Sequence, residues 1–98
     1  MAFKENYPHL YILLGTCFFV GAEEGLTDEA VLAEYRSSVS AEELALAYAE
    51  MTRLLAADAS DWKQAAHEAW RYFAEPEEIR NWLLMTKTAL AAYLATTE

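Results

Sequence analysis

Hydrophobic residues fill most of the segment from Leu10 to Val20, and a helix wound through it is apolar on every side. The apolar positions of one face are Tyr7, Leu10, Tyr11, Leu14 and Phe18, and those of the opposite face are Ile12, Leu13 and Phe19. A helix that is apolar all round needs neighbours on every side. The pattern therefore predicts a helix over residues 7–20 in the middle of a helical bundle.

Residues that cap helices mark where the later helices begin. Thr27 precedes two acidic residues, whose negative charges suit the positive end of a helix dipole. Ser40 and Glu43 form a capping box, and Pro76 suits a first helical position. Apolar residues recur every three or four positions after each start, which predicts helices over residues 27–38, 40–57, 61–73 and 76–95.

No stretch alternates apolar and polar residues for long enough to predict a strand. The connection from Gly21 to Leu26 is the one predicted loop of any length. The chain has 98 residues, 55% of them hydrophobic, which suffices for the core of one domain. Three Gly and two Pro are few residues that break helices. These features predict an all-α fold, a single compact bundle of about five helices over residues 1–98.

The apolar run also imitates the core of a secretion signal, because it follows Lys4 and ends in small residues. Glu5 offsets the charge of Lys4, and the run is too short to span a bilayer. A lipoprotein cleavage site would need a smaller residue than Thr16 before Cys17. A single Cys excludes an internal disulfide framework and fits a reducing compartment. We therefore expect a cytoplasmic protein.

Acidic charge is concentrated in one third of the chain. The sequence has sixteen Asp and Glu against seven Lys and Arg, a net charge of −9, and residues 22–50 contain eight of the acids and one base. Such a charge repels phosphate and anionic lipid, so we expect neither nucleic acid nor a membrane as a partner. It attracts a basic protein, which is the expected partner. The alternative interpretation is that these acids only solubilise outward helix faces.

Few residues have the spacing that catalysis or metal binding requires. His67 lies on a predicted helix, but the residue four positions later is Arg71, so the paired histidines of a zinc protease are missing. Cys17 lies in the apolar helix, where a thiol behaves as a small hydrophobe and not as a nucleophile paired with His9. Neighbouring glutamates point in different directions, and there is no glycine-rich phosphate loop. The sequence therefore predicts no enzyme, no catalytic residue, no metal site and no cofactor.

Aromatic residues are a further notable group, with three Trp, six Tyr and four Phe. Most are expected in the core, but Trp62, Tyr72 and Trp82 stand near helix ends or beside charged residues, where an exposed ring can anchor a partner. Tyr35 and Tyr48 lie in the acidic third. An exposed Tyr among carboxylates would suit a basic partner, and the alternative is a core ring whose hydroxyl reaches water.

The segment YPHLYILLGTCFF at residues 7–19 combines an aromatic-Pro-x-Leu-Tyr run, an apolar stretch, a Gly and further aromatics. An acidic helix, a short break and a second helix follow at residues 28–56, and EEIRNWLLMTKTAL stands at residues 77–90. Together these segments resemble the small all-helical immunity proteins of bacterial contact-dependent growth inhibition systems. The stretches after the first helix and before the last one depart from that family's pattern. The resemblance implies a non-catalytic cytoplasmic inhibitor of a toxin domain, often a nuclease, delivered by a neighbouring cell.

The resemblance and the charge pattern indicate the same function, because a nuclease has a basic substrate surface that an acidic helical body can occupy. We expect a monomer when free. The expected toxin-binding residues are Glu23, Glu24, Asp28, Glu29, Glu34 and Tyr35. One alternative is a helical adaptor or secretion chaperone, often dimeric, that holds an apolar client segment on an exposed apolar patch. Another is an enzyme or small-molecule binder, whose pocket would use His9, His67 and Cys17.

Overall fold

All regular structure in residues 3–96, the part of the chain that the computed structural model describes, is helical. The elements in chain order are α1 (Phe3–Asn6), α2 (Pro8–Tyr11), the π-helical segment η1 (Ile12–Phe18), α3 (Phe19–Glu24), α4 (Asp28–Ser38), α5 (Ala41–Ala56), α6 (Ala59–Glu68) and α7 (Pro76–Ala95). This arrangement confirms the predicted all-α bundle.

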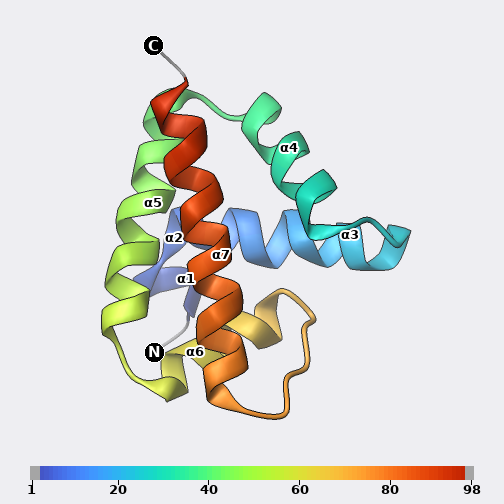
Figure 1. Ribbon diagram of the computed structural model, residues 1–98, viewed down its shortest axis with the longest axis vertical. Helices are drawn as coiled ribbons and strands as arrows, with labels where there is room; N and C mark the ends of the chain where they lie inside the picture. The colour runs from blue at the N-terminus through green and yellow to red at the C-terminus, as the bar shows by residue number, and fades with distance from the viewer. Residues whose placement is uncertain (1–2, 97–98) are drawn as a thin grey trace.

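Helices in two main directions build the bundle. The elements α2, η1 and α3 follow one another as one long rod, and the antiparallel pair α5 and α7 crosses it (Figure 1). α5 packs against α2, while α4 and α6 pack against η1. The rod therefore meets other helices along most of its length, as its apolar sequence requires.

The core forms where the rod meets the other helices. Leu10, Leu13, Leu14 and Phe18 of the rod are fully buried in one cluster with side chains from α4 to α7. Burial of a side chain of this size stabilises the fold by about 1.5–3 kcal/mol. Not every side of the rod is covered, since Val20 remains 42% exposed.

The predicted loop from Gly21 to Leu26 is wrong in its first four residues, because the helix continues to Glu24. Gly21 is buried, and a Cβ at this position would lie 2.4 Å from Val31 Cγ2, so the glycine allows α3 and α4 to pack closely. The helix ends at Gly25, whose φ of 72° is a left-handed conformation that glycine adopts at little cost. The Leu26 amide then donates to the Gly21 carbonyl at 2.8 Å.

α6 also differs from the helix predicted over residues 61–73. It begins two residues earlier, at Ala59, because the Asp58 side chain caps it. It ends at Glu68, five residues before the predicted end. The three-and-four spacing of apolar residues continues past this end, so periodicity alone did not indicate the turn that follows.

Trp70 makes that turn. Its φ of 59° is the one left-handed backbone conformation of a non-glycine residue within residues 3–96. The Arg71 amide donates to the Ala66 carbonyl at 2.9 Å, and the Trp70 amide donates to the His67 carbonyl at 3.1 Å. This is the Schellman pattern of helix ends, in which the left-handed position is usually Gly. A bulky residue at this position is strained.

The predicted caps of α4 and α5 are confirmed. Thr27 Oγ1 accepts the Ala30 amide at 3.1 Å, and Ser40 Oγ accepts the Glu43 amide at 3.1 Å. A capping box would turn the Glu43 carboxylate back to Ser40. The carboxylate binds His9 instead, with 2.7 Å between Glu43 Oε2 and His9 Nδ1.

Candidate functional site

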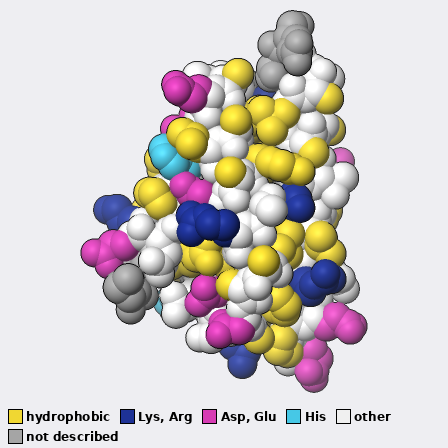
Figure 2. Space-filling model, turned by 90° about the vertical axis from the view of Figure 1, so that its left-hand side faces the viewer, with side chains coloured by type: hydrophobic (Ala, Val, Ile, Leu, Met, Phe, Trp, Pro, Cys, Tyr) yellow, Lys and Arg dark blue, Asp and Glu magenta, His cyan; other side chains and the backbone are white. Residues whose placement is uncertain are grey.

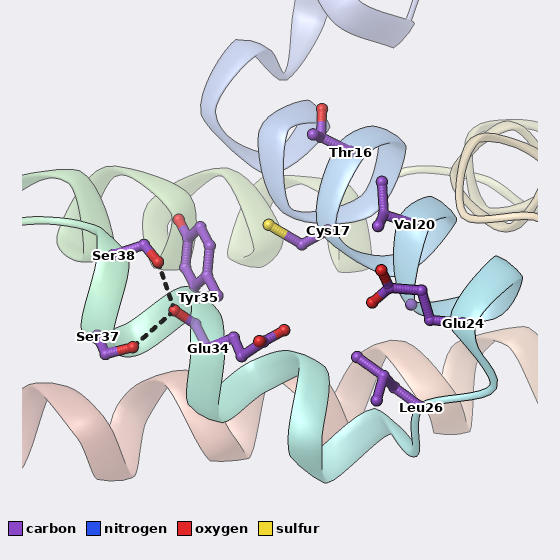
Figure 3. A pocket seen from close by; sticks show the side chains of 10 residues that line it. Thr16, Cys17, Val20, Glu24, Leu26, Glu34, Tyr35, Ser37 and Ser38 are labelled. Carbon is purple, nitrogen blue, oxygen red and sulfur yellow. Dashed lines mark hydrogen bonds between the residues drawn. The ribbon is translucent and has the colours of Figure 1, made fainter.

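A groove of about 360 Å³ lies between α4 and the end of the rod formed by η1 and α3 (Figure 3). Val20 and Glu24 stand on the wall made by α3, and Glu34 stands on the wall made by α4 (Figure 3). Cys17 and Tyr35 face each other at the inner end of the groove (Figure 3). The helix continues to Glu24, one turn past the end that the sequence predicted. This last turn carries Glu24 opposite α4 and so forms one wall of the groove.

Two carboxylates face each other across this groove. Glu24 and Glu34 are both exposed, and their side chains extend toward each other from α3 and α4 (Figure 3). Among the described residues that line the groove there is no Lys or Arg. Facing carboxylates without a neighbouring cation attract one, and a Lys or Arg side chain of another protein has the complementary charge. The groove is therefore the candidate site for a basic ligand.

Tyr35 is part of the core beneath this groove. Its side chain is 1% exposed, so the expectation of an exposed Tyr35 on a contact surface is wrong. The hydroxyl does not reach water either, because it is buried and has no hydrogen-bond partner among the described residues. Burial, with a smaller contribution from the nearby Glu43, raises the pKa of the Tyr35 hydroxyl and keeps it neutral.

Replacing Tyr35 with Phe is expected to leave the free energy of unfolding unchanged or to raise it by about 1 kcal/mol, because a buried hydroxyl without a partner is removed. Urea unfolding followed by circular dichroism measures this change. Tyr7→Phe is the matched control, since the Tyr7 hydroxyl donates to Asp61 Oδ2 at 3.1 Å, and it should lose about 0.5–1.5 kcal/mol. An equal loss in both variants would contradict the assignment of Tyr35 as unpartnered.

Asp28 stabilises the fold instead of standing free at the surface. One of its carboxylate oxygens pairs with Arg71 Nη2, and the other accepts the indole N–H of Trp82 at 3.1 Å. These bonds join the start of α4 to α7 and to the connection between α6 and α7. The toxin contact expected at Asp28 stays a prediction, but Arg71 neutralises the charge that such a contact would use.

The other acids expected at the contact surface lie outside the groove. Glu29 and Glu34 are five residues apart on α4, which separates them by about 140° around the helix axis. Glu29 therefore faces a different side of α4 from Glu34. Glu23 is exposed beside Glu24 but does not line the groove. Of the expected set, the structure brings together Glu24 and Glu34, with Tyr35 buried beneath them.

A further acid of the acidic third acts inside the fold. Glu50 is 7% exposed, and its Oε1 accepts the amide of His9 at 2.9 Å and the amide of Leu10 at 2.8 Å. These amides belong to the first turn of α2, where backbone N–H groups have no partner within the helix. Glu50 therefore caps α2 from α5, and its negative charge suits the positive end of the helix.

The bond between His9 and Glu43 predicts a pH-dependent stability. The hydrogen bond to Glu43 raises the pKa of His9 above its usual value of 6.5. The stabilisation is therefore complete below about pH 6.5 and is lost as the pH rises through the folded-state value. We expect the difference in unfolding free energy between the wild type and His9→Gln to be largest below about pH 6.5 and to shrink as the pH rises above it. Chemical denaturation at several pH values measures it, and a constant difference would contradict the bond.

Cys17, His9 and His67 do not form one polar pocket. His9 binds Glu43, and Cys17 lines the groove, where burial raises the pKa of its thiol and keeps it protonated. His67 lies on α6 and lines two other cavities. Within residues 3–96, no three or more His, Cys, Asp or Glu side chains are grouped as metal ligands.

Exposed aromatic rings gather in the connection between α6 and α7. Tyr72 is 82% exposed, as expected for a possible anchor, and Trp70 is 52% exposed. Trp82 is 7% exposed, so the expectation that it can anchor a partner is wrong. Trp62 is partly buried, and its indole N–H donates to the Leu54 carbonyl at 2.8 Å. Sequence reasoning missed Trp70 because it placed this residue within a longer helix.

The groove with Glu24 and Glu34 is thus the part of the expected surface that the fold assembles. No helix in the described part of the chain has the length and apolar character needed to cross a membrane. Comparisons with protein-family models, with curated proteins and with solved structures find no match to this chain.

Proposed function

We propose that this protein is a toxin inhibitor, an immunity protein of a contact-dependent growth inhibition system, and that the acidic groove binds its toxin. The observation that carries the proposal is the pair Glu24 and Glu34, which face each other across a groove that no Lys or Arg of the described residues lines (Figure 3). The protein around them has a net charge of −9. A basic protein is the partner that this charge distribution favours.

The proposed inhibition is steric and electrostatic. A toxin that cleaves nucleic acid has a basic substrate surface, and an acidic helical body of 98 residues can cover it. Exposed ion pairs contribute only about 0–1 kcal/mol each, so net charge mainly accelerates the encounter. A cation between Glu24 and Glu34 would meet carboxylates on two walls, which supports the groove as a point where charge also contributes to affinity.

On the side of the molecule where α5 lies, the mixture of exposed side chains supports an inhibitor over an adaptor or chaperone (Figure 2). The large exposed ones are Ile12 on η1, Val20 on α3, Leu46 on α5, Met85 on α7, and Trp70 and Tyr72 in the connection between α6 and α7. On the side where α5 lies, acidic, basic and apolar side chains are interspersed (Figure 2). A client-binding adaptor would need a contiguous apolar patch.

Co-expression with the toxin domain encoded directly upstream of the gene tests the proposal. We expect the wild type to restore growth and to co-purify with the toxin in equal amounts. Glu24→Gln with Glu34→Gln should weaken the complex, whereas Glu42→Gln with Glu77→Gln, which removes the same charge elsewhere, should not. If the wild type neither restores growth nor forms a complex with the toxin, the proposed function as a toxin inhibitor is wrong. Full affinity of the Glu24 and Glu34 variant would contradict the proposal that the groove binds the toxin.

A further inference from the structure

A second cavity, of about 320 Å³, lies along another side of the rod. The residues that line it are Tyr11, Gly15, Phe19, His67, Glu68 and Trp70. Three of them are aromatic rings from separate turns of the rod and from the connection after α6, and one is a carboxylate. We call this cavity, lined by these six residues, the aromatic cage.

Trp70 forms the outer wall of the aromatic cage. Its ring is edge-on to Phe19, with 4.8 Å between ring centroids and 68° between ring planes, a favourable aromatic geometry. It is nevertheless 52% exposed and sits at the strained left-handed position that ends α6. Glycine would end the helix there without strain. A strained backbone that holds out a large exposed ring is typical of binding sites.

Gly15 and Tyr11 form the inner wall. A Cβ on residue 15 would lie 2.7 Å from Tyr11 Cε1, so the glycine leaves the space that this ring occupies. The Lys4 ammonium already lies 5.4 Å from the centroid of the Tyr11 ring, so Trp70, Phe19 and Glu68 supply the attraction for a further cation. Any larger residue at position 15 would displace the ring.

The combination of rings and a carboxylate selects positive charge. Aromatic faces attract cations, most strongly when the cation loses part of its water. Glu68 adds a full negative charge at the same cavity. A guanidinium group suits such a site better than an ammonium, because it is planar, stacks on rings and binds a carboxylate with two parallel hydrogen bonds.

We propose that the aromatic cage binds an arginine side chain of the basic protein partner. This inference rests on the proposed function for the identity of the partner. Phe19 lines the cage and Val20 lines the acidic groove, so the two sites occupy neighbouring sides of α3. One partner can therefore place cationic side chains in both. Trp70 then supplies the rigid aromatic anchor that exposed charge pairs do not.

Titration of the isotope-labelled protein with the N-methylamide of Nα-acetylarginine tests the cage without any toxin. We expect a saturable shift of the Trp70 indole N–H and of the Gly15 amide. The indoles of Trp62 and Trp82 are internal references, because their N–H groups are bonded to Leu54 and Asp28. The corresponding citrulline amide has nearly the same shape without the charge, and it should produce no saturable shift.

Three variants separate the contributions, with the Gly15 amide as the common reporter. Trp70→Gly should fold, because glycine adopts the left-handed turn, and should lose binding. Glu68→Gln should weaken binding by about 3- to 10-fold. Glu77→Gln removes an acid from the exposed first turn of α7 and should bind as the wild type does.

Equal shifts with the citrulline amide, or unchanged binding by Trp70→Gly, would overturn the arginine site. If growth rescue succeeds while the arginine amide does not bind, the proposed function stands and the cage fails. If the arginine amide binds at the cage and rescue fails, the cage stands as a guanidinium site and the toxin assignment fails.

Discussion

Replacing Glu50 with Ala is expected to lower the free energy of unfolding by about 2–4 kcal/mol, because one buried amide and one half-buried amide lose their acceptor. The carboxylate is 7% exposed and accepts the N–H groups of His9 and Leu10 at 2.9 and 2.8 Å. Leu10 is fully buried, so water cannot replace the missing bond without opening the contact between α2 and α5. Urea unfolding followed by circular dichroism measures the loss.

Two further variants separate charge from hydrogen bonding at this position. Glu50→Gln keeps one acceptor oxygen without the charge, and we expect about half the loss of Glu50→Ala, since charged acceptors make the stronger bonds. Glu42→Ala removes an exposed acid from the same helix and should change stability by less than about 0.5 kcal/mol. Equal effects of Glu42→Ala and Glu50→Ala would contradict the role of Glu50 as the cap of α2.

Reversing the charge of the acidic groove is expected to slow association with a basic toxin. The variant Glu24→Lys with Glu34→Lys places two cations where the wild type has facing carboxylates. At low salt we expect an association rate constant about 10- to 100-fold below that of the wild type, and a weaker dependence on ionic strength. Stopped-flow mixing at several salt concentrations measures both.

The control for this experiment has the same net charge in another place. Glu42→Lys with Glu77→Lys changes two exposed acids on α5 and α7 and should slow association much less. If both double variants associate equally slowly, the net charge of the protein determines the association rate and the position of Glu24 and Glu34 in the groove does not. If neither is slow, the toxin binds a face without these acids.

The starts of α4 and α5 were predictable from sequence because they depend on contacts within a few residues. A Thr or Ser side chain reaches the amide three positions later, so Thr27 and Ser40 mark these helices whatever surrounds them. The all-α class was predictable for a related reason. Apolar residues repeat with the helical period, while glycines and prolines are few.

Helix ends were harder to predict, since they depend on what packs nearby. Gly21 looks like the start of a loop in the sequence, yet it lies within a helix, where its missing side chain makes room for Val31 of the next helix. Trp70 looks like a helix residue, yet it takes a left-handed turn that sequence rules assign to glycine. Its ring packs on Phe19, a contact that no local pattern contains.

By itself, the sequence determined the class of fold, most of the helices and a net charge of −9. The tertiary structure alone decided which acids are available to a partner. Glu50 and Asp28 bind groups of the same chain that are at least 40 positions away. Glu24 and Glu34 instead face each other across an open groove. The physical reason is that the number of charged residues is a property of the sequence. Whether a charged side chain finds an internal partner depends on how the helices pack. Acids that look equivalent in the sequence therefore become a helix cap, a partner in an ion pair or the lining of an open groove.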